Sequence, residues 1–119
     1  MAVFKDVLER IRTRVEGTLA VSLIGLDGIA IETVDDGTVP TESMGAEFGG
    51  FVKSIRLSNT ELSTGDVEQF ALVTEKYITF LSAVTAEYFV LLILSRNGNY
   101  GRARFELLRA RDELQAELS

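Results

Sequence analysis

The segment from Phe89 to Leu94, FVLLIL, is apolar at every position and constrains the fold more than any other part of the chain. A strand with one face in water alternates apolar and polar side chains, so a fully apolar strand indicates that both of its faces are covered. Polar residues such as Thr79 and Glu87 interrupt the surrounding apolar stretch, which falls far short of the roughly 20 residues of a membrane helix. We therefore expect a central strand between two layers of helices, and no insertion into a membrane.

The rest of the chain supplies the other strands and the covering helices. Apolar residues recur at helical spacing over residues 2–16, from Thr41 to about Leu62, and over residues 101–118. Asp27-Gly28 separates two β-prone runs and is a strong hairpin signal, and two further runs precede the apolar strand. The order α-β-β-α-β-β-β-α predicts one α/β (α+β) domain over residues 1–119, with a five-stranded antiparallel sheet and helices on both faces. Thr41 is expected to cap the second helix.

Composition excludes several classes of chemistry. The chain has neither cysteine nor histidine, which rules out disulfides, Cys/His zinc sites and catalysis by imidazole. Its net charge is −6, and residues 17–100 carry four basic residues against eleven acidic ones. A nucleic-acid binder usually has a basic stripe, so no nucleic-acid partner is expected. The first residues do not resemble a secretory leader, and we expect a cytoplasmic protein.

Two carboxylate pairs are the remaining candidates for chemistry. Asp35-Asp36 falls in an expected loop and Asp112-Glu113 on the last helix, and no second cluster can be placed beside either. We therefore expect no catalytic residue, no metal, no cofactor and no enzyme activity. A small-molecule sensor, or an enzyme that uses only carboxylates and hydroxyls, stays open if a deep pocket is lined by Asp35, Asp36 or Arg102.

The second helix contains three glycines, although each interior glycine costs a helix about 1 kcal/mol relative to alanine. On a helical wheel the large apolar residues form the expected core stripe, which comprises Met44, Phe48, Phe51, Val52, Ile55 and Leu62. A second group lies away from that stripe and comprises Gly45, Ala46, Gly49, Gly50, Lys53 and Arg56. Small side chains let another backbone approach closely, so this face is predicted to bind an acidic partner. The alternative is that the glycines are neutral drift, or that the helix kinks or breaks near Gly49-Gly50.

The third strand, Asp66–Glu75, has little protection if it lies at the edge of the sheet. Its central seven residues contain no lysine or proline, and Val67, Gln69, Ala71 and Val73 share one face. An edge of this kind tends to pair with another strand, and a symmetric dimer through these four residues would satisfy it.

The last helix has a clear core stripe and two apolar residues outside it. The stripe comprises Ala103, Leu107, Ala110, Leu114 and Leu118. Phe105 and Leu108 lie off the stripe and are expected to pack against the first helix, with a second interface as the alternative.

Two long segments carry a resemblance to a known family. LAVSLIGLDGIAIE forms the first expected hairpin, and GDVEQFALVTEKYITFLSAVTAEYFVLLILSRNGNYGRAR runs from the third strand into the last helix. The chain resembles the Roadblock/LC7 family, and within it the bacterial and archaeal MglB-type branch, over nearly all of its length. Longin and profilin-like domains share the general layout.

The resemblance implies a dimer and a partner. Members join their third strands into a continuous sheet, with the second helices side by side. MglB-type dimers bind a small Ras-like GTPase of the MglA type and stimulate hydrolysis without donating a catalytic residue. The GTPase would rest on the small-residue face of the second helix. The alternative is a structural dimerisation scaffold of the dynein-light-chain Roadblock type.

Overall fold

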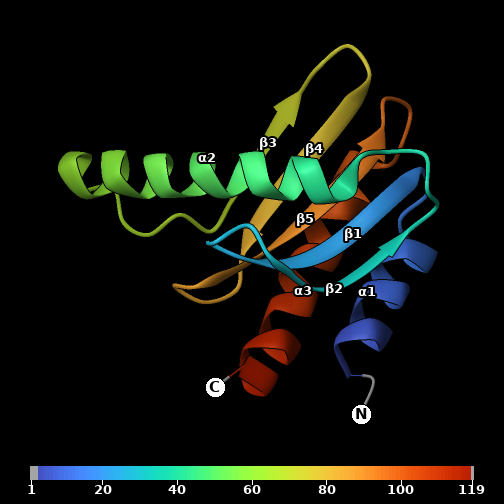
Figure 1. The fold of residues 1–119 in the computed structure, drawn as a ribbon, viewed down its shortest axis with the longest axis horizontal. Coiled ribbons are helices and arrows are strands. Elements are labelled where there is room, and N and C mark those ends of the chain that lie inside the picture. Colours follow the sequence, from blue (N-terminus) through green and yellow to red (C-terminus); the bar gives the residue numbers. More distant parts are fainter. Residues whose placement is uncertain (1–2, 119) are drawn as a thin grey trace.

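The apolar strand β5 (Tyr88–Ser95) lies at the centre of a five-stranded antiparallel sheet (Figure 1). In the computed structural model, which describes residues 3–118, the strand order is β2-β1-β5-β4-β3. The other strands are β1 (Thr18–Gly25), β2 (Ala30–Asp35), β3 (Gln69–Val73) and β4 (Tyr77–Ala83). Every residue from Phe89 to Leu94 is buried, which confirms that both faces of this strand are covered.

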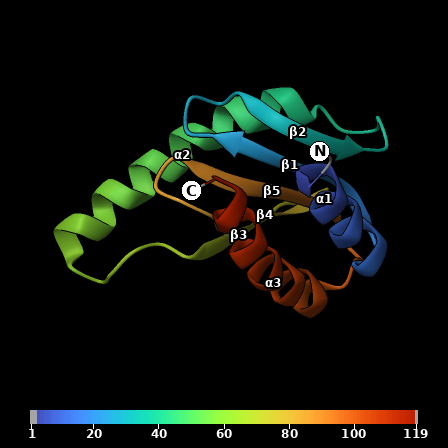
Figure 2. The same ribbon diagram turned by 90° about the horizontal axis from the view of Figure 1, so that it is seen from below.

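Three helices form the two outer layers. The helices α1 (Val3–Arg14) and α3 (Tyr100–Leu118) lie side by side on one face of the sheet, and α2 (Thr41–Leu62) lies on the other (Figure 2). The order α-β-β-α-β-β-β-α is the one predicted. None of the described helices is long and apolar enough to cross a membrane.

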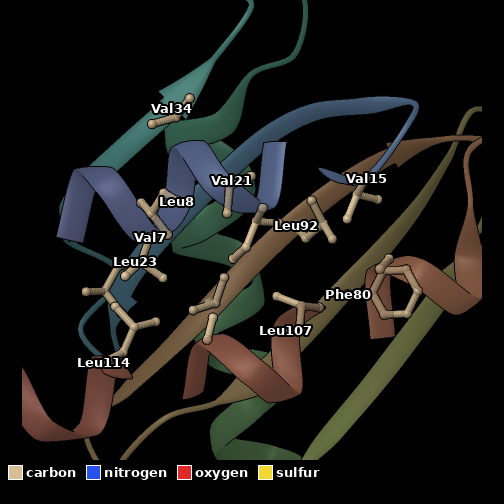
Figure 3. Close-up of a cluster of buried hydrophobic side chains, with 14 of the residues drawn as sticks. Val7, Leu8, Val15, Val21, Leu23, Val34, Phe80, Leu92, Leu107 and Leu114 are labelled. Carbon is tan, nitrogen blue, oxygen red and sulfur yellow. The ribbon is translucent and has the colours of Figure 1, made fainter. Parts of the chain in front are cut away.

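The larger core lies between the sheet and the α1–α3 pair (Figure 3). Val7 and Leu8 of α1 and Leu107 of α3 meet Leu92 of β5 in this cluster. The expected stripe of α3 is confirmed, since four of its five residues are buried and Leu118 is partly buried. Burial on this face therefore follows the helical periodicity of the sequence.

The core under α2 is smaller. Phe48 and Val52 are the only large α2 side chains that are buried, and they pack over residues of β1, β4 and β5. The prediction that Phe51 and Leu62 belong to the core is wrong, because their side chains are 50% and 70% exposed. The C-terminal half of α2 extends past the sheet (Figure 1).

Of the two local predictions made at chain turns, the Asp27-Gly28 hairpin turn is confirmed and the Thr41 helix cap is wrong. Gly28 in the β1–β2 turn has a φ of +85°, and the backbone N–H of Ile29 donates to Asp27 Oδ1 at 2.9 Å. Thr41 does not cap α2: Pro40 occupies the N-cap position, and the Thr41 hydroxyl donates instead to the carbonyl of Val39.

Candidate protein-interaction surface

The glycines of α2 do not share one face. Gly45 and Gly49 are buried, and a Cβ on Gly45 would lie 2.6 Å from Ile24 Cδ1. A Cβ on Gly49 would lie 3.3 Å from the carbonyl oxygen of Leu26. The prediction that these two glycines point away from the sheet is therefore wrong. Gly50 alone has open space around its Cα.

The physical reason is the close approach of α2 to the β1–β2 hairpin. A Cβ on Gly28 in the hairpin turn would lie 3.0 Å from Ala46 Cα, so a glycine on each side lets the two backbones approach. The helical wheel of the sequence analysis assumed that only large side chains of α2 face the core. In the structure, atoms of the β1–β2 hairpin occupy the space next to Gly45 and Gly49. The helix is continuous from Thr41 to Leu62, so the alternative of a break at Gly49-Gly50 is wrong as well.

The remaining residues predicted to bind a partner divide by exposure. Ala46, Gly50 and Lys53 are exposed, and with Leu57, which is 65% exposed, they form one stripe that we name the outer face of α2. Arg56 is half-buried, and its guanidinium donates to the carbonyls of Thr85, at 3.0 Å, and Ala86. Arg56 therefore ties α2 to the β4–β5 turn.

A second α2 surface was missed because its residues were assigned to the core. Phe51 and Leu62 are exposed and Ile55 is partly buried; we name these three residues the apolar flank of α2. The ring of Phe51 lies 5.5 Å from that of Phe48, centroid to centroid. The sequence carries no clear signal of this arrangement, because Gly28 is already explained by the positive φ of its turn.

Strand β3 is the last strand of the sheet and pairs only with β4 within residues 3–118. The Thr74 N–H donates to the Tyr77 carbonyl, and the Ala83 N–H to the Glu68 carbonyl, each at 2.9 Å. Hydrogen-bonded and non-hydrogen-bonded pairs alternate along an antiparallel ladder. The outward backbone groups therefore belong to Gln69, Ala71 and Val73.

The structure also differs from the predicted edge in two respects. The strand is shorter than Asp66–Glu75, and Val67 precedes it. Ala71 packs against the larger core, and the Gln69 amide donates to the Ser82 hydroxyl at 3.4 Å. The backbone of these residues, more than their side chains, is what the edge offers.

The two carboxylate pairs have structural partners. Asp36 accepts hydrogen bonds from the hydroxyl and the N–H of Thr38, at 2.6 and 2.9 Å, which lowers its pKa. Glu113 forms an ion pair with Arg10 at 2.5 Å, which lowers the pKa of Glu113 and raises that of Arg10. No group of three or more acidic residues able to hold a metal ion occurs within residues 3–118.

A cavity of about 610 Å³ opens between the end of α2, the β4–β5 turn and α3. Asn59, Asp66, Val67 and Arg111 are among the residues that line it, whereas Asp35, Asp36 and Arg102 are not. The residues that would have marked a sensor or a carboxylate enzyme are thus not gathered in this cavity.

Comparison with solved structures identifies the family. A Roadblock/LC7 domain from Streptomyces avermitilis superimposes with a TM-score of 0.85 at 17% identity over 94% of each chain. MglC from Myxococcus xanthus is 30% identical over 97% of this chain and 98% of its own, with a TM-score of 0.70. The chain belongs to the Roadblock/LC7 family.

The other comparisons of this Roadblock chain support the fold and not a particular branch of the family. Myxococcus xanthus MglB has a TM-score of 0.85 but 17% identity, over 95% of this chain and 92% of its own, and so shares the fold. No family model matches the sequence, and no curated protein sequence matches it.

Proposed function

We propose that this Roadblock chain is a non-enzymatic, dimeric regulator of a small Ras-like GTPase. The observation that carries the proposal is the β3 edge, whose five residues are uncharged and whose alternate backbone groups point outward. Phe70 of β3 and Phe48 of α2 belong to the same core cluster, so the edge and α2 share one side of the sheet. A second protomer can therefore meet both at once.

In the proposed homodimer two β3 strands pair about a two-fold axis. Their outward N–H and C=O groups at Gln69, Ala71 and Val73 would then be satisfied. The apolar flanks of the two α2 helices would lie side by side and remove Phe51 and Leu62 from water. An exposed edge and exposed apolar side chains are both explained by this one contact.

The outer faces of the two α2 helices would form the docking surface for the GTPase. Ala46 and Gly50 are small and exposed, so a partner's backbone can approach, and Lys53 supplies a positive charge. Gly45 and Gly49 act indirectly in this proposal, by seating α2 on the hairpin. As the resemblance to the MglB-type branch implies, the proposed regulation repositions groups of the GTPase itself and donates no catalytic residue.

The test is GTP hydrolysis by a small Ras-like GTPase encoded beside this protein, measured with and without it. We expect the protein to change the hydrolysis rate and Gly50→Arg to abolish the change, because nothing lies within 4 Å of a Cβ on Gly50 and the variant should fold. Ala116→Arg, on exposed α3, is the matched control. Equal activity of both variants would contradict docking on the outer face of α2.

One observation favours the alternative, a structural scaffold of the Roadblock type. Because Arg56 is engaged by the β4–β5 turn, Lys53 is the one cation left on the outer face of α2 as defined above. A scaffold would dimerise normally and bind its partner without changing the rate of hydrolysis.

A further inference from the structure

The outer surface of α1 and α3 lies on the opposite side of the sheet from α2 and has no part in the proposed function. Phe105 is 51% exposed and Leu108 is 38% exposed on this surface. The expectation was that both residues pack against α1, and their exposure shows that such packing does not cover them. Two large apolar side chains, one helical turn apart, therefore face outward on α3.

Arginines surround the exposed ring. The guanidinium carbons of Arg102 and Arg109 each lie 5.7 Å from the centroid of Phe105. At this distance a cation is attracted to the face of an aromatic ring. The ring thus holds the two guanidiniums close to the apolar surface.

The same arginines converge on one buried carboxylate. Glu106 is 2% exposed and forms ion pairs with Arg102 at 3.2 Å, Arg109 at 3.9 Å and, across the helix pair, Arg14 of α1 at 3.5 Å. One carboxylate meets three guanidiniums, so positive charge remains. The three arginine side chains are still 38–49% exposed, so an approaching partner can reach them.

Nearby acids cancel only part of this excess. Glu113 is paired with Arg10 and also attracts Arg109 and Arg14, and Glu9 lies 3.7 Å from Arg12 on α1. The four arginines Arg10, Arg14, Arg102 and Arg109 face two carboxylates, Glu106 and Glu113, so two positive charges remain. The rest of the molecule is acidic, with eleven acidic residues and four basic ones over residues 17–100. The arginines are thus concentrated where two helices meet.

We propose that this surface binds an acidic amphipathic segment of a partner protein. Apolar side chains of the segment cover Phe105 and Leu108, and its carboxylates bind Arg14, Arg102 and Arg109. Guanidinium groups suit this role because their planar array of donors matches a carboxylate in two-point contact. Glu106 is a positioning residue that fixes the three guanidiniums in one array.

A protein segment fits better than a polyanion. Nucleic acid and anionic lipid present extended negative charge, which the acidic remainder of the chain repels. Lipid recognition through charge also relies on larger clusters, of about 4–8 basic residues. A short segment touches only the arginine cluster and its central ring.

The probe is a fluorescein-labelled amphipathic peptide with leucines along one helical face and glutamates beside them. Binding is measured by fluorescence anisotropy, with a second peptide in which glutamine replaces every glutamate. We expect the acidic peptide to bind, and each of Arg109→Glu and Phe105→Ser to weaken it about tenfold. Circular dichroism checks folding, and Leu108→Ser replaces Phe105→Ser if that variant does not fold.

The matched controls make the same types of substitution, a charge reversal and the loss of an apolar side chain, outside the proposed binding surface. Arg12→Glu makes the same charge change on α1, beside Glu9, and Ile29→Ser removes an apolar side chain that is 69% exposed on the β1–β2 turn. Both should bind within about twofold of the unchanged protein. Equal loss in test and control variants, equal binding of the glutamine peptide, or binding of phosphatidylserine vesicles or a thymidine oligonucleotide in place of the peptide would overturn the proposal. This surface lies on the opposite side of the sheet from α2, so such a failure leaves the GTPase proposal standing.

Discussion

The two edges of the sheet are built differently although both border exposed apolar residues. The β2 edge contains Glu32 and Asp35, and its pairing with β1 shifts register between Leu23 and Ile24. The β3 edge has no charge within Gln69–Val73 and keeps an unbroken register with β4. Charges and irregular pairing both discourage the addition of a strand.

This difference extends to the helix above the sheet. Gly45 and Gly49 of α2, with Gly28, let the helix pack against the β1–β2 hairpin, so the β2 side is covered closely and the β3 side is left open. Exposed apolar area alone would not distinguish the edges, since Ile29 is 69% exposed near β2 and Val73 is 54% exposed on β3. Backbone regularity, charge and helix placement distinguish them.

The largest expected effect comes from removing one outward donor of β3. Ala71→Pro leaves the ladder to β4 intact but removes an N–H from the proposed interface of both protomers. Two hydrogen bonds are lost, one per protomer, and each leaves a buried carbonyl unsatisfied at about 1.5 kcal/mol, so the loss should sum to about 3 kcal/mol, or about a hundredfold in the dimer dissociation constant. Sedimentation velocity over a concentration series measures the dimer dissociation constant of the variant and of the unchanged protein.

The control for this variant is Thr33→Pro on the other edge. The Asp36 N–H donates to the Leu19 carbonyl, so by alternation the Thr33 backbone also points outward. We expect little change in association. A hundredfold loss from Thr33→Pro, or none from Ala71→Pro, would reverse the assignment of the open edge.

The next effect tests why α2 lies on the β2 side. Gly45→Val adds atoms where even a Cβ would lie 2.6 Å from Ile24 Cδ1, and overpacking typically lowers the free energy of unfolding by about 2 kcal/mol. Gly50→Ala has open space and should raise it by up to about 1 kcal/mol through helix propensity. Urea denaturation measures both variants, and a stabilised Gly45→Val protein would refute the close contact.

A smaller effect concerns the apolar flank of α2. Phe51→Ser should weaken the dimer about tenfold, since a half-exposed ring becomes buried only on association. Ile29→Ser, near the β2 edge, should leave the dimer unchanged. Analytical ultracentrifugation separates the two, and equal effects would mean that apolar area at either edge drives association.

The smallest effect concerns a charge beside β2. The Thr38 hydroxyl is the largest cause of the lowered pKa of Asp36, so Thr38→Ala should raise that pKa toward its ordinary value. Because the folded pKa is the lower one, this hydrogen bond stabilises the protein above the unfolded pKa and is lost as pH falls through the folded pKa. NMR titration of the Asp36 carboxyl measures the shift, and an unchanged pKa would contradict it.

Periodicity and turn chemistry were enough to predict the element order, the central strand and the core stripe of α3. The same signals did not predict which face of α2 lies toward the sheet. A helical wheel treats α2 by itself, and it cannot show that the β1–β2 hairpin, elsewhere in the sequence, packs against the small residues of the helix. Phe105 was misplaced for a related reason: its side chain is supported by arginines, and sequence spacing does not show that an aromatic ring packs against cations. The exposure of both surfaces depends on tertiary contacts.

The overhang of α2 links folding to association. None of the described residues of this helix beyond Val52 is buried, and Arg56 is the residue there that the β4–β5 turn holds by hydrogen bonds. A short helical segment with few tertiary contacts is marginal in water. In the proposed dimer the partner's α2 supplies further contacts, so association would stabilise the last turns. Helix content should then fall on dilution. The concentration of protomers would thereby determine what fraction of the proposed docking surface on α2 is folded.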